Sequence, residues 1–422
     1  MGQAQVQQGS NNFGNTTVSH GQAALGNFND SVIRQANNNA TSPVISSNKG
    51  TKKTEEHRRE AYTVAWICAL PREQAALVLD DVHEKLQSKP HETTYILGRI
   101  DVHNVVVACL PTMGTTAAAR CVARLEDGFK SLRFILLVGI GGGVPTKTDI
   151  RLGDVIVSAP TKKYGGVLQY DYGTKFQTEH LEIRPSALGR PSELLVTAIA
   201  AMNTRYTQSS DGKTIGEVLH HYTTMLGEKF PQMQSVRRPR RDQLFAASYR
   251  HLDDDLACDK CNCDAVNVVN RPLRSDAYPR IHAGLIASGN EVMRDAIERD
   301  RMAHETGVLC FEMEAAGLQT SLGWLVVRGV CDYCDSHKNK DWQDYAAAVA
   351  TAYAKELLKV VPGSELEPEH PDTISAMSNL AVTLSDQGKT EEAASMQQQV
   401  LEMRQRILGP ERPNPISAMK DH

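Results

Sequence analysis

The chain has 422 residues, with 46 basic and 50 acidic side chains and a formal net charge of −4. This near-neutral balance excludes a general attraction for polyanions, so we expect neither nucleic acid nor a membrane surface as a partner, and any anion binding must be local. No apolar run reaches the ~18 residues of a membrane span, and nine cysteines, several of them in apolar runs, indicate reduced thiols. We expect a soluble, cytoplasmic protein with room for two or three domains.

Residues 1–60 are rich in Gly, Asn, Gln and Ser and end in a run of charges. A stretch of this composition buries too little apolar surface to fold alone, so we interpret it as a disordered tail and linker. Its Gly/Asn segments at 12–19 and 26–29 also resemble short motifs that precede fungal immune-receptor proteins. The sequence leaves the role of these segments open.

From residue 63 the pattern changes to short, β-branched apolar runs that alternate with helical segments of about 10 to 15 residues, which predicts an α/β fold with a largely parallel sheet. We expect strands at 63–69, 104–110, 134–140, 154–158, 281–288, 308–312 and 324–330. We expect helices at 73–80, 115–127, 290–301, 313–322 and 342–361. Between 186 and 280 the apolar rhythm weakens and charge rises, which indicates an insertion with helices at 193–202 and 215–226.

The pattern changes again in residues 362–422. The segment at 370–377 returns in altered form at 412–419, with two helical stretches between them. This arrangement predicts a linker and a helical hairpin of the tetratricopeptide type, and it resembles the kinesin-light-chain variety. Because such repeats bury their faces only against neighbours, one repeat and a fraction is not expected to form a working array.

A glycine-rich turn, Val138–Pro145, follows one of the apolar runs. Glycines let a backbone pass close to a ligand, but the turn alone is a weak signal. Residues 151–157 form another apolar run almost at once, so the turn does not open a helix as it does in a dinucleotide-binding fold. We therefore expect no bound dinucleotide, and no cofactor at all.

Five segments in a fixed order carry a more specific signal. They are Ala65–Glu73, Leu136–Pro145 with Leu152–Val155, Ile286–Asn290, Phe311–Gly317 and Val327–Tyr333. Over residues 61–361 they resemble the nucleoside phosphorylase and methylthioadenosine/adenosylhomocysteine nucleosidase superfamily, and Cys331–Lys340 is most similar to variants fused to fungal receptor-type proteins. The resemblance implies a three-layer fold around a mixed, largely parallel twisted sheet, cleavage of a purine N-glycosidic bond, and a homo-oligomer.

Asp332 matches the family's acid, which hydrogen-bonds to or protonates purine N7 and implies an adenine-type base. Burial beside Val330 and Cys331 would favour its protonated form, although a loop or helix-capping aspartate is the alternative. Glu314 matches the carboxylate that accepts both ribose hydroxyls, and Met313 a residue that packs over the ribose. The residues expected around the base are Ile140, Gly141 and Phe311.

Glu312 lies two residues before Glu314, so the two carboxylates share a face if the backbone is extended there. We expect Glu312 to stand outside the site or behind it. A surface-facing carboxylate is an equal alternative.

Glu73 decides the reaction type. It matches the acid that nucleosidases use to orient water, whereas phosphorylases place glycine and arginine in this loop to hold phosphate, and here Arg72 precedes Glu73. A carboxylate repels phosphate, which favours hydrolysis and leaves phosphorolysis as the alternative. Glu73 is also a normal residue for the first turn of a helix.

Thr115 and Thr116 match a helix-opening turn that supports the 5′ side of the ribose, and Arg120 follows about one turn later. Relatives fused to defence proteins are thought to cut ATP into adenine and ribose triphosphate, and the resemblance implies that option for an effector domain here. The residues expected to hold phosphates are Arg72, Thr115, Thr116, Arg120, Lys338 and Lys340. An inactive nucleotide-binding module remains a third hypothesis.

The insertion contains Cys258-Xaa-Xaa-Cys261-Xaa-Cys263. Cys-Xaa-Xaa-Cys is a common zinc half-site, but a second half is missing unless His251 or His282 folds back onto it. Free thiols in a loop are the simpler interpretation, so we predict no metal site and leave the role of the three cysteines open.

Overall fold

The structure is a computed structural model. It describes residues 59–70, 78–84, 94–175, 181–183, 190–209, 212–229, 236–253, 258, 260, 261, 263–363, 378, 381, 382, 384 and 390–408. Most of the expected helix at 73–80, including Glu73, lies outside these ranges. Arg72, most of the expected N-terminal tail and most of the expected C-terminal hairpin lie outside them too. Within these ranges, no helix has the length and apolar character needed to cross a membrane.

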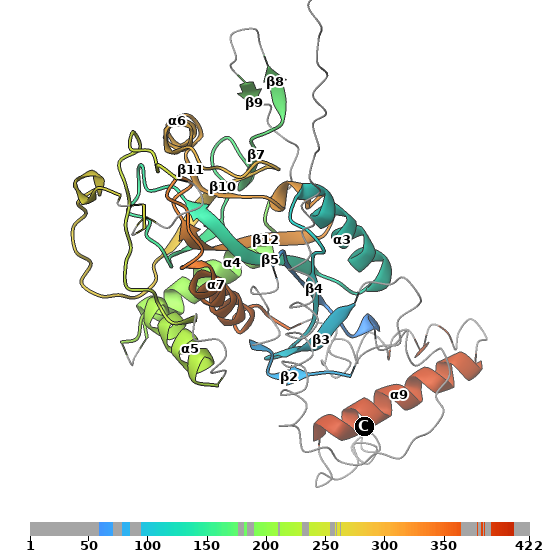
Figure 1. Ribbon diagram of the computed structural model, residues 1–422. Helices are drawn as coiled ribbons and strands as arrows, with labels where there is room; N and C mark the ends of the chain where they lie inside the picture. The colour runs from blue at the N-terminus through green and yellow to red at the C-terminus, as the bar shows by residue number, and fades with distance from the viewer. Residues whose placement is uncertain are drawn as a thin grey trace, which may run out of the picture. The chain divides into compact units, whose positions relative to one another are not determined.

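A mixed sheet forms the centre of the domain (Figure 1). Its strands are β1 (Val64–Cys68), β2 (Asp81–Val82), β3 (Tyr95–Ile100), β4 (His103–Cys109), β5 (Phe134–Gly143), β6 (Val155–Ser158), β7 (Val167–Gln169), β10 (Ile281–Ser288), β11 (Val308–Glu312) and β12 (Gly323–Asp332). Their order is β11-β10-β6-β12-β5-β1-β4-β3-β2, with β7 on β10. The pairs on both sides of β1 and the β5–β12 pair are parallel, so the expected mixed, largely parallel sheet is confirmed.

Five of these strands close into a ring. β11, β10, β6, β12 and β5 pair in sequence, and β11 pairs again with β5 in antiparallel fashion through Phe311 and Gly142. A separate two-stranded sheet joins β8 (Gly173–Lys175) to β9 (Leu181–Ile183). The ring therefore brings the C-terminal ends of β5, β11 and β12 together.

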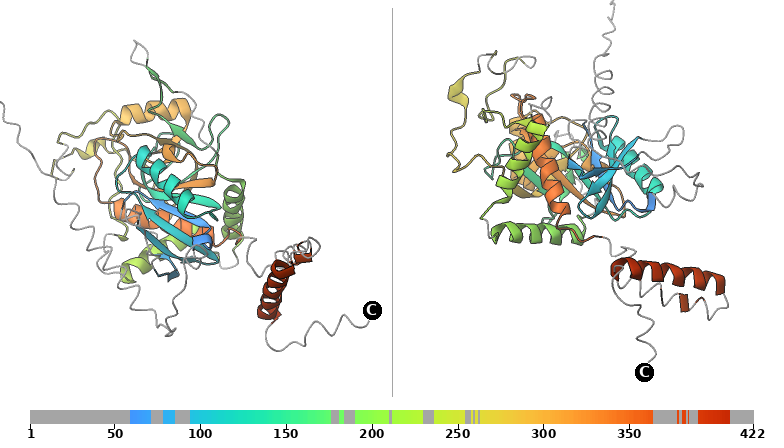
Figure 2. Two further views of the ribbon diagram at one scale, coloured as in Figure 1. Left: turned by 90° about the vertical axis from the view of Figure 1, so that its right-hand side faces the viewer. Right: turned by 90° about the horizontal axis from the view of Figure 1, so that it is seen from below.

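Helices cover the sheet on both sides. α7 (Gln343–Leu358) packs on β5 and β12 beside α4 (Glu193–Thr207) and α5 (Ile215–Lys229), as the further views show (Figure 2). The other helices of the domain are α3 (Thr115–Gly128) and α6 (Ala296–Thr306), which lie apart from this group. The expected strands and both insertion helices are confirmed, with ends shifted by a few residues.

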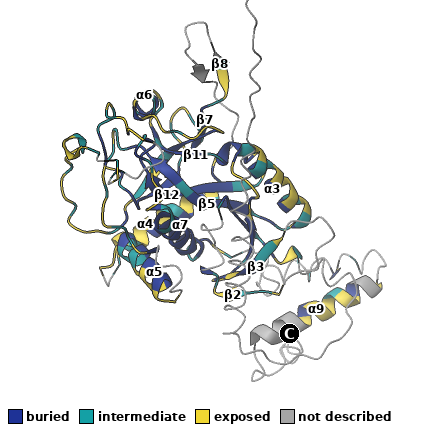
Figure 3. Cartoon of the chain, in the orientation of Figure 1, coloured by how far each residue is buried: buried dark blue, intermediate teal, exposed yellow. Residues whose placement is uncertain are grey.

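The central strands are buried on both faces (Figure 3). Continuous apolar runs such as the one in β12 are typical of parallel strands covered by helices. α7 is itself almost wholly buried, and a Cβ atom on Gly329 would lie 1.9 Å from the carbonyl oxygen of Ala346. Glycine at this position lets α7 rest directly on the strand that ends at Asp332.

Two expected helices were wrong. The helix expected at 290–301 begins only at Ala296, because the carboxylate of Asp295 accepts the amides of Ile297 and Glu298 and caps it there. The helix expected at 313–322 is a single short turn, Ala315–Gly317. Gly317 lies against the start of α3, where a Cβ atom would come 2.1 Å from the carbonyl oxygen of Thr115, so this segment is packed too closely for a continuous helix.

β3 was not expected from the sequence, because its central Gly98 interrupts its apolar pattern. β2, β7, β8 and β9 have only two or three residues each, too few for a periodic pattern. In the C-terminal region the structure describes α9 (Thr390–Leu408), which corresponds to one helix of the expected hairpin.

Candidate active site

A cavity of about 180 Å³ opens where β1, β5, β11 and β12 end. Its wall contains carboxylates and also apolar side chains such as those of Ala69, Leu70 and Met293. Many of the residues singled out from the sequence line it, namely Ile140, Gly141, Phe311, Met313, Glu314, Asp332 and Lys338. The structure thus brings together the residues expected at the base, the ribose and the acid.

Asp332 is the last residue of β12, and the register of that strand against β5 shifts between Val330 and Asp332. Such a bulge redirects the side chain that follows it. One carboxylate oxygen accepts the amide of Cys334 at 2.9 Å, and a Cβ atom on Gly142 would lie only 2.7 Å from the same oxygen. The glycine-rich end of β5 therefore makes room for the Asp332 carboxylate.

Lys338 is the main polar neighbour of Asp332. Its Nζ atom lies 2.9 Å from the second carboxylate oxygen, which also accepts the thiol of Cys331 at 3.1 Å. Burial alone would lower the pKa of Lys338, but the carboxylate of Asp332 raises it above the ordinary value. Asp332 therefore contacts an ammonium and a backbone amide in addition to the apolar residues beside it in the strand.

Arg328 joins the two glutamates and was missed by the sequence analysis. It is fully buried in β12, and its Nη2 atom donates to Glu312 and, at 3.1 Å, to Glu314. Glu312 also accepts the amides of Glu314 at 3.0 Å and Ala315 at 3.0 Å. A single basic residue among the apolar residues of this strand was the available signal, since a buried charge needs a partner.

Glu312 is buried at 5% exposure, so the surface-facing alternative was wrong. Its contacts place it behind Glu314, although it also contributes to the cavity wall. The position of the Glu314 carboxylate is thus set by a neighbouring carboxylate through the guanidinium that both of them bind.

The first residues of α3 connect the cavity to a second one. Glu314 accepts the amide of Gly114 at 3.2 Å, while the amide and hydroxyl of Thr115 both donate to Asn290 at 3.1 Å. The second cavity, of about 320 Å³, shares Met113 with the first and is lined by Thr116 and Arg120.

The residues expected to hold phosphates are therefore divided. Thr115, Thr116 and Arg120 gather at the start of α3, whereas Lys338 pairs with Asp332. Lys340 is exposed and lines neither of these two cavities.

The cysteines of the insertion are arranged differently from the expected half-site. His251, Cys258, Cys263 and His337 each place a potential ligand atom within 4.8 Å of the others, and Cys261 is not part of this group. His282 instead contacts Asp154 at 2.9 Å. The sequence analysis predicted no metal site and did not identify this group, because His337 lies far from the cysteines in the sequence.

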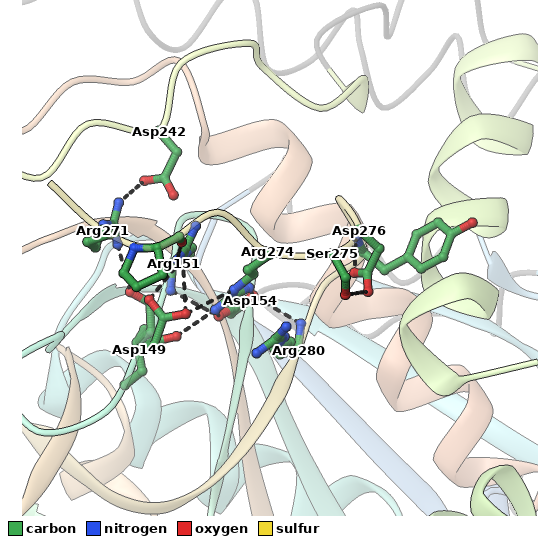
Figure 4. A network of polar contacts seen from close by, with 12 residues as sticks. Asp149, Arg151, Asp154, Asp242, Arg271, Arg274, Ser275, Asp276 and Arg280 are labelled. Atoms are coloured by element: carbon green, nitrogen blue, oxygen red, sulfur yellow. Dashed lines mark hydrogen bonds and ion pairs between the residues drawn. The ribbon is translucent and has the colours of Figure 1, made fainter.

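Another buried carboxylate, that of Asp154, lies in a network of arginines (Figure 4). Arg274 donates to both of its oxygens at 2.7 Å, and the amides of Arg151 and Arg280 add bonds of 2.9 and 3.0 Å. Burial by itself would raise the pKa of Asp154, but the hydrogen bonds from Arg274, His282 and the Arg280 amide lower it below the ordinary value.

Comparisons with known proteins agree with the geometry. The sequence profile of the phosphorylase superfamily matches residues 63–362, and that of a tetratricopeptide repeat matches residues 373–414. A nucleotide-binding leucine-rich repeat (NLR)-like protein of Hyaloscypha variabilis is 42% identical over 317 residues, 73% of this chain and 30% of that protein. The chain thus spans less than a third of that relative. The 5′-methylthioadenosine/S-adenosylhomocysteine nucleosidase of Mycobacterium bovis is 24% identical over 315 residues, 72% of this chain and 98% of the nucleosidase.

The chain is also similar to solved structures. The 5′-methylthioadenosine/S-adenosylhomocysteine nucleosidase of S. pneumoniae has a TM-score of 0.45 and 19% identity, covering 71% of this chain and 100% of that one. The futalosine hydrolase of Helicobacter pylori has a TM-score of 0.45 and 12% identity, covering 71% of this chain and 98% of that one.

Proposed function

The chain belongs to the phosphorylase superfamily, and from this premise we propose that residues 61–361 hydrolyse the N-glycosidic bond of an adenine nucleoside or nucleotide. The observation that carries the proposal is the cavity wall, in which Asp332 and Glu314 stand beside the apolar side chains of Ile140 and Phe311. The M. bovis relative, named for two adenine nucleosides, supports the same class of substrate.

Asp332 acts on the base. Protonated Asp332 donates its proton to purine N7 as the bond between C1′ and N9 breaks, so that neutral adenine leaves. Lys338, at 2.9 Å, then stabilises the carboxylate that remains. Ile140, Gly141 and Phe311 supply the flat apolar wall against which the base packs.

Glu314 acts on the sugar. Its carboxylate accepts the ribose hydroxyls, and its negative charge favours the positive charge that develops on the ribose as the bond to the base breaks. Arg328 and the amide of Gly114 fix the direction of the carboxylate. Met313, on the same cavity wall, packs over the ribose.

Water is the proposed nucleophile, oriented by Glu73, which follows Leu70 of the cavity wall by three residues. Phosphorolysis, with Arg72 holding inorganic phosphate, is the alternative. Purified protein is incubated with adenosine, methylthioadenosine and ATP, with and without inorganic phosphate, and free adenine is measured by chromatography. Adenine release without phosphate is expected, and a strict requirement for phosphate would contradict hydrolysis.

The Asp332→Asn variant tests the assignment of the acid. We expect adenine release to fall by about 10²–10⁴-fold, because the amide cannot protonate the base. Asp341→Asn, an exposed aspartate in the same segment, is the matched control and should keep wild-type activity. Unchanged release by Asp332→Asn would remove Asp332 from the mechanism. Absence of release by wild type from every purine tested would favour a binding module.

The 5′ end of the substrate is proposed to lie at the second cavity. Thr116 and Arg120 there can bind phosphates, which supports a nucleotide such as ATP as one option. Arg120→Ala should then raise KM for ATP and leave KM for adenosine unchanged. Equal effects on both substrates would place the phosphates elsewhere.

An effector role in a defence protein is supported by the NLR-like relative, of which this chain covers 30%. The proposed partner is a small purine nucleoside or nucleotide. A homo-oligomer stays a prediction, which size-exclusion chromatography with light scattering would test.

A further inference from the structure

Two histidines and two cysteines from distant parts of the chain meet beside the segment that follows β12. His251, Cys258 and Cys263 belong to the insertion, and His337 follows Asp332 by five residues. All four potential ligand atoms lie within 4.8 Å of one another, with both histidines buried and both cysteines half-buried. Two thiols and two imidazoles are a common ligand set for structural zinc.

The distances from His337 to the two sulfur atoms are close to those of a tetrahedral metal site. Zinc–sulfur bonds of about 2.3 Å and zinc–nitrogen bonds of about 2.05 Å imply a sulfur–nitrogen separation of roughly 3.6 Å. The Nδ1 atom of His337 lies 3.7 Å from the sulfur of Cys258 and 3.8 Å from that of Cys263. Both distances therefore exceed the tetrahedral value by only about 0.1–0.2 Å.

The orientation of His337 is the second observation that indicates a ligand. Its Nε2 atom lies 3.1 Å from the carbonyl oxygen of Tyr249. Because a carbonyl oxygen only accepts, Nε2 carries the proton and Nδ1 directs its lone pair toward the two sulfurs. Metal-binding histidines typically donate their other N–H to such an acceptor.

The ring plane of His337 is also fixed. Phe245 stacks on it with centroids 3.9 Å apart and planes 16° apart, and Tyr249 lies at 5.3 Å and 17°. The fourth group, His251, has an Nδ1 atom that the amide of Asp253 approaches only to 3.4 Å. This contact is at the outer limit of a hydrogen bond, so little is lost if this nitrogen binds a metal.

We propose that His251, Cys258, Cys263 and His337 bind one structural zinc ion. Four protein ligands leave no open position for water or substrate, so the ion is not catalytic. Zinc binding replaces the thiol protons, and two thiolates neutralise the charge of the ion in this half-buried place.

The ion would hold the insertion against the active-site segment. His337 donates its amide to Asp335 at 3.0 Å, and the amide of His251 binds the hydroxyl of Ser336 at 2.9 Å. A cavity of about 270 Å³ is lined by Cys258 and His337 and also by Asp332 and Lys338. The proposed ion therefore positions the segment that carries Lys338.

The test is the metal content of the full chain, purified under reducing conditions without added metal and measured by inductively coupled plasma mass spectrometry. We expect about one zinc ion per chain. Cys263→Ser should reduce the content to less than about one fifth of wild type, because it removes a thiolate ligand. Cys261→Ser is the matched control, since it changes a cysteine of the same loop outside the group, and it should keep its zinc.

Reconstitution of the wild-type protein with cobalt gives a second test, which does not depend on whether a variant folds. Wild-type protein stripped of metal should take up one equivalent of Co²⁺ and develop a thiolate-to-cobalt charge-transfer band, whose intensity reports two cysteine ligands. Absence of zinc in wild type together with no uptake of Zn²⁺ or Co²⁺ would overturn the proposal. Loss of zinc in Cys261→Ser but not in Cys263→Ser, or a disulfide between Cys258 and Cys263 in place of metal, would overturn it too.

Discussion

Two buried carboxylate clusters of this domain use arginine in different ways. The carboxylate of Asp154 accepts hydrogen bonds from Arg274 and from two backbone amides, and it also contacts His282 (Figure 4). Glu314 shares the Nη2 atom of Arg328 with Glu312 and lies in the wall of the cavity that Asp332 also lines. The cavity beside Asp154 has no lining residue in common with that one.

The comparison teaches that a buried charge is not by itself a sign of catalysis. Both clusters satisfy the need of a buried carboxylate for donors. Of the two, only the Glu314 cluster shares a cavity wall with Asp332, a carboxylate from another strand, and with apolar side chains such as Phe311. Variants of the two clusters should therefore separate stability from activity.

The largest effect is expected from Arg328→Met. This change leaves Glu312 and Glu314 buried without the cation that both of them bind, and removing one partner of a buried ion pair costs about 3–5 kcal/mol. The free energy of unfolding, measured by urea denaturation, should fall by that amount. A loss below about 1 kcal/mol would show that the glutamates do not depend on Arg328.

Glu314→Gln and Asp154→Asn form the second test. Glu314→Gln should reduce kcat/KM for adenine release by about 10–100-fold, since a charged hydrogen bond contributes about 1.5–3 kcal/mol. Asp154→Asn should reduce the amount of folded protein and leave the kcat/KM of the folded fraction close to wild type. A large loss of kcat/KM in folded Asp154→Asn would place the two clusters in one functional unit.

The smallest effect is expected from Arg274→Met, which removes a donor to Asp154 and Asp149. Burial by itself would raise the pKa of both carboxylates, but Arg274 lowers the pKa of Asp154, and Arg151 together with Arg274 lowers that of Asp149. A lowered pKa adds stability above the unfolded value of about 4 and loses it as pH falls through the folded value. The variant should be less stable than wild type by about 1–3 kcal/mol at neutral pH. This difference should narrow below about pH 4, where both carboxylates take up protons. Circular dichroism during acid titration measures it, and a difference that is the same at all pH values would exclude ionised Asp154 as its cause.

Much of the fold could be predicted because the central strands are continuous apolar runs, as in β5 and β12. Five segments with family likeness also indicated Asp332, Glu314 and the residues around them before any contact was known. The helix expected at 313–322 failed because periodicity does not report that Gly317 must lie against the start of α3.

Other features depend on contacts between residues that are distant in the sequence. In the sequence, Lys338 and Asp332 are two charged residues with no visible relation. Only the structure shows that the ammonium of Lys338 lies next to the carboxylate of Asp332. His337 meets Cys258 from 79 residues away, so no local spacing reveals the group that they form. Arg328 was detectable in principle, as the one basic residue of an otherwise largely apolar strand, but its two partners were not.

The ring of β11, β10, β6, β12 and β5 has a further consequence. β5, which contains Ile140 and Gly141, β11, which ends at Glu312, and β12, which ends at Asp332, all belong to one closed ring of hydrogen-bonded strands. A closed ring cannot lose one strand and keep the spacing of the others, because each of its five strands is paired on both sides within the ring. The site at the ends of these strands is therefore expected to form in an all-or-none manner. It should form in the same cooperative folding step in which β11 pairs with β5.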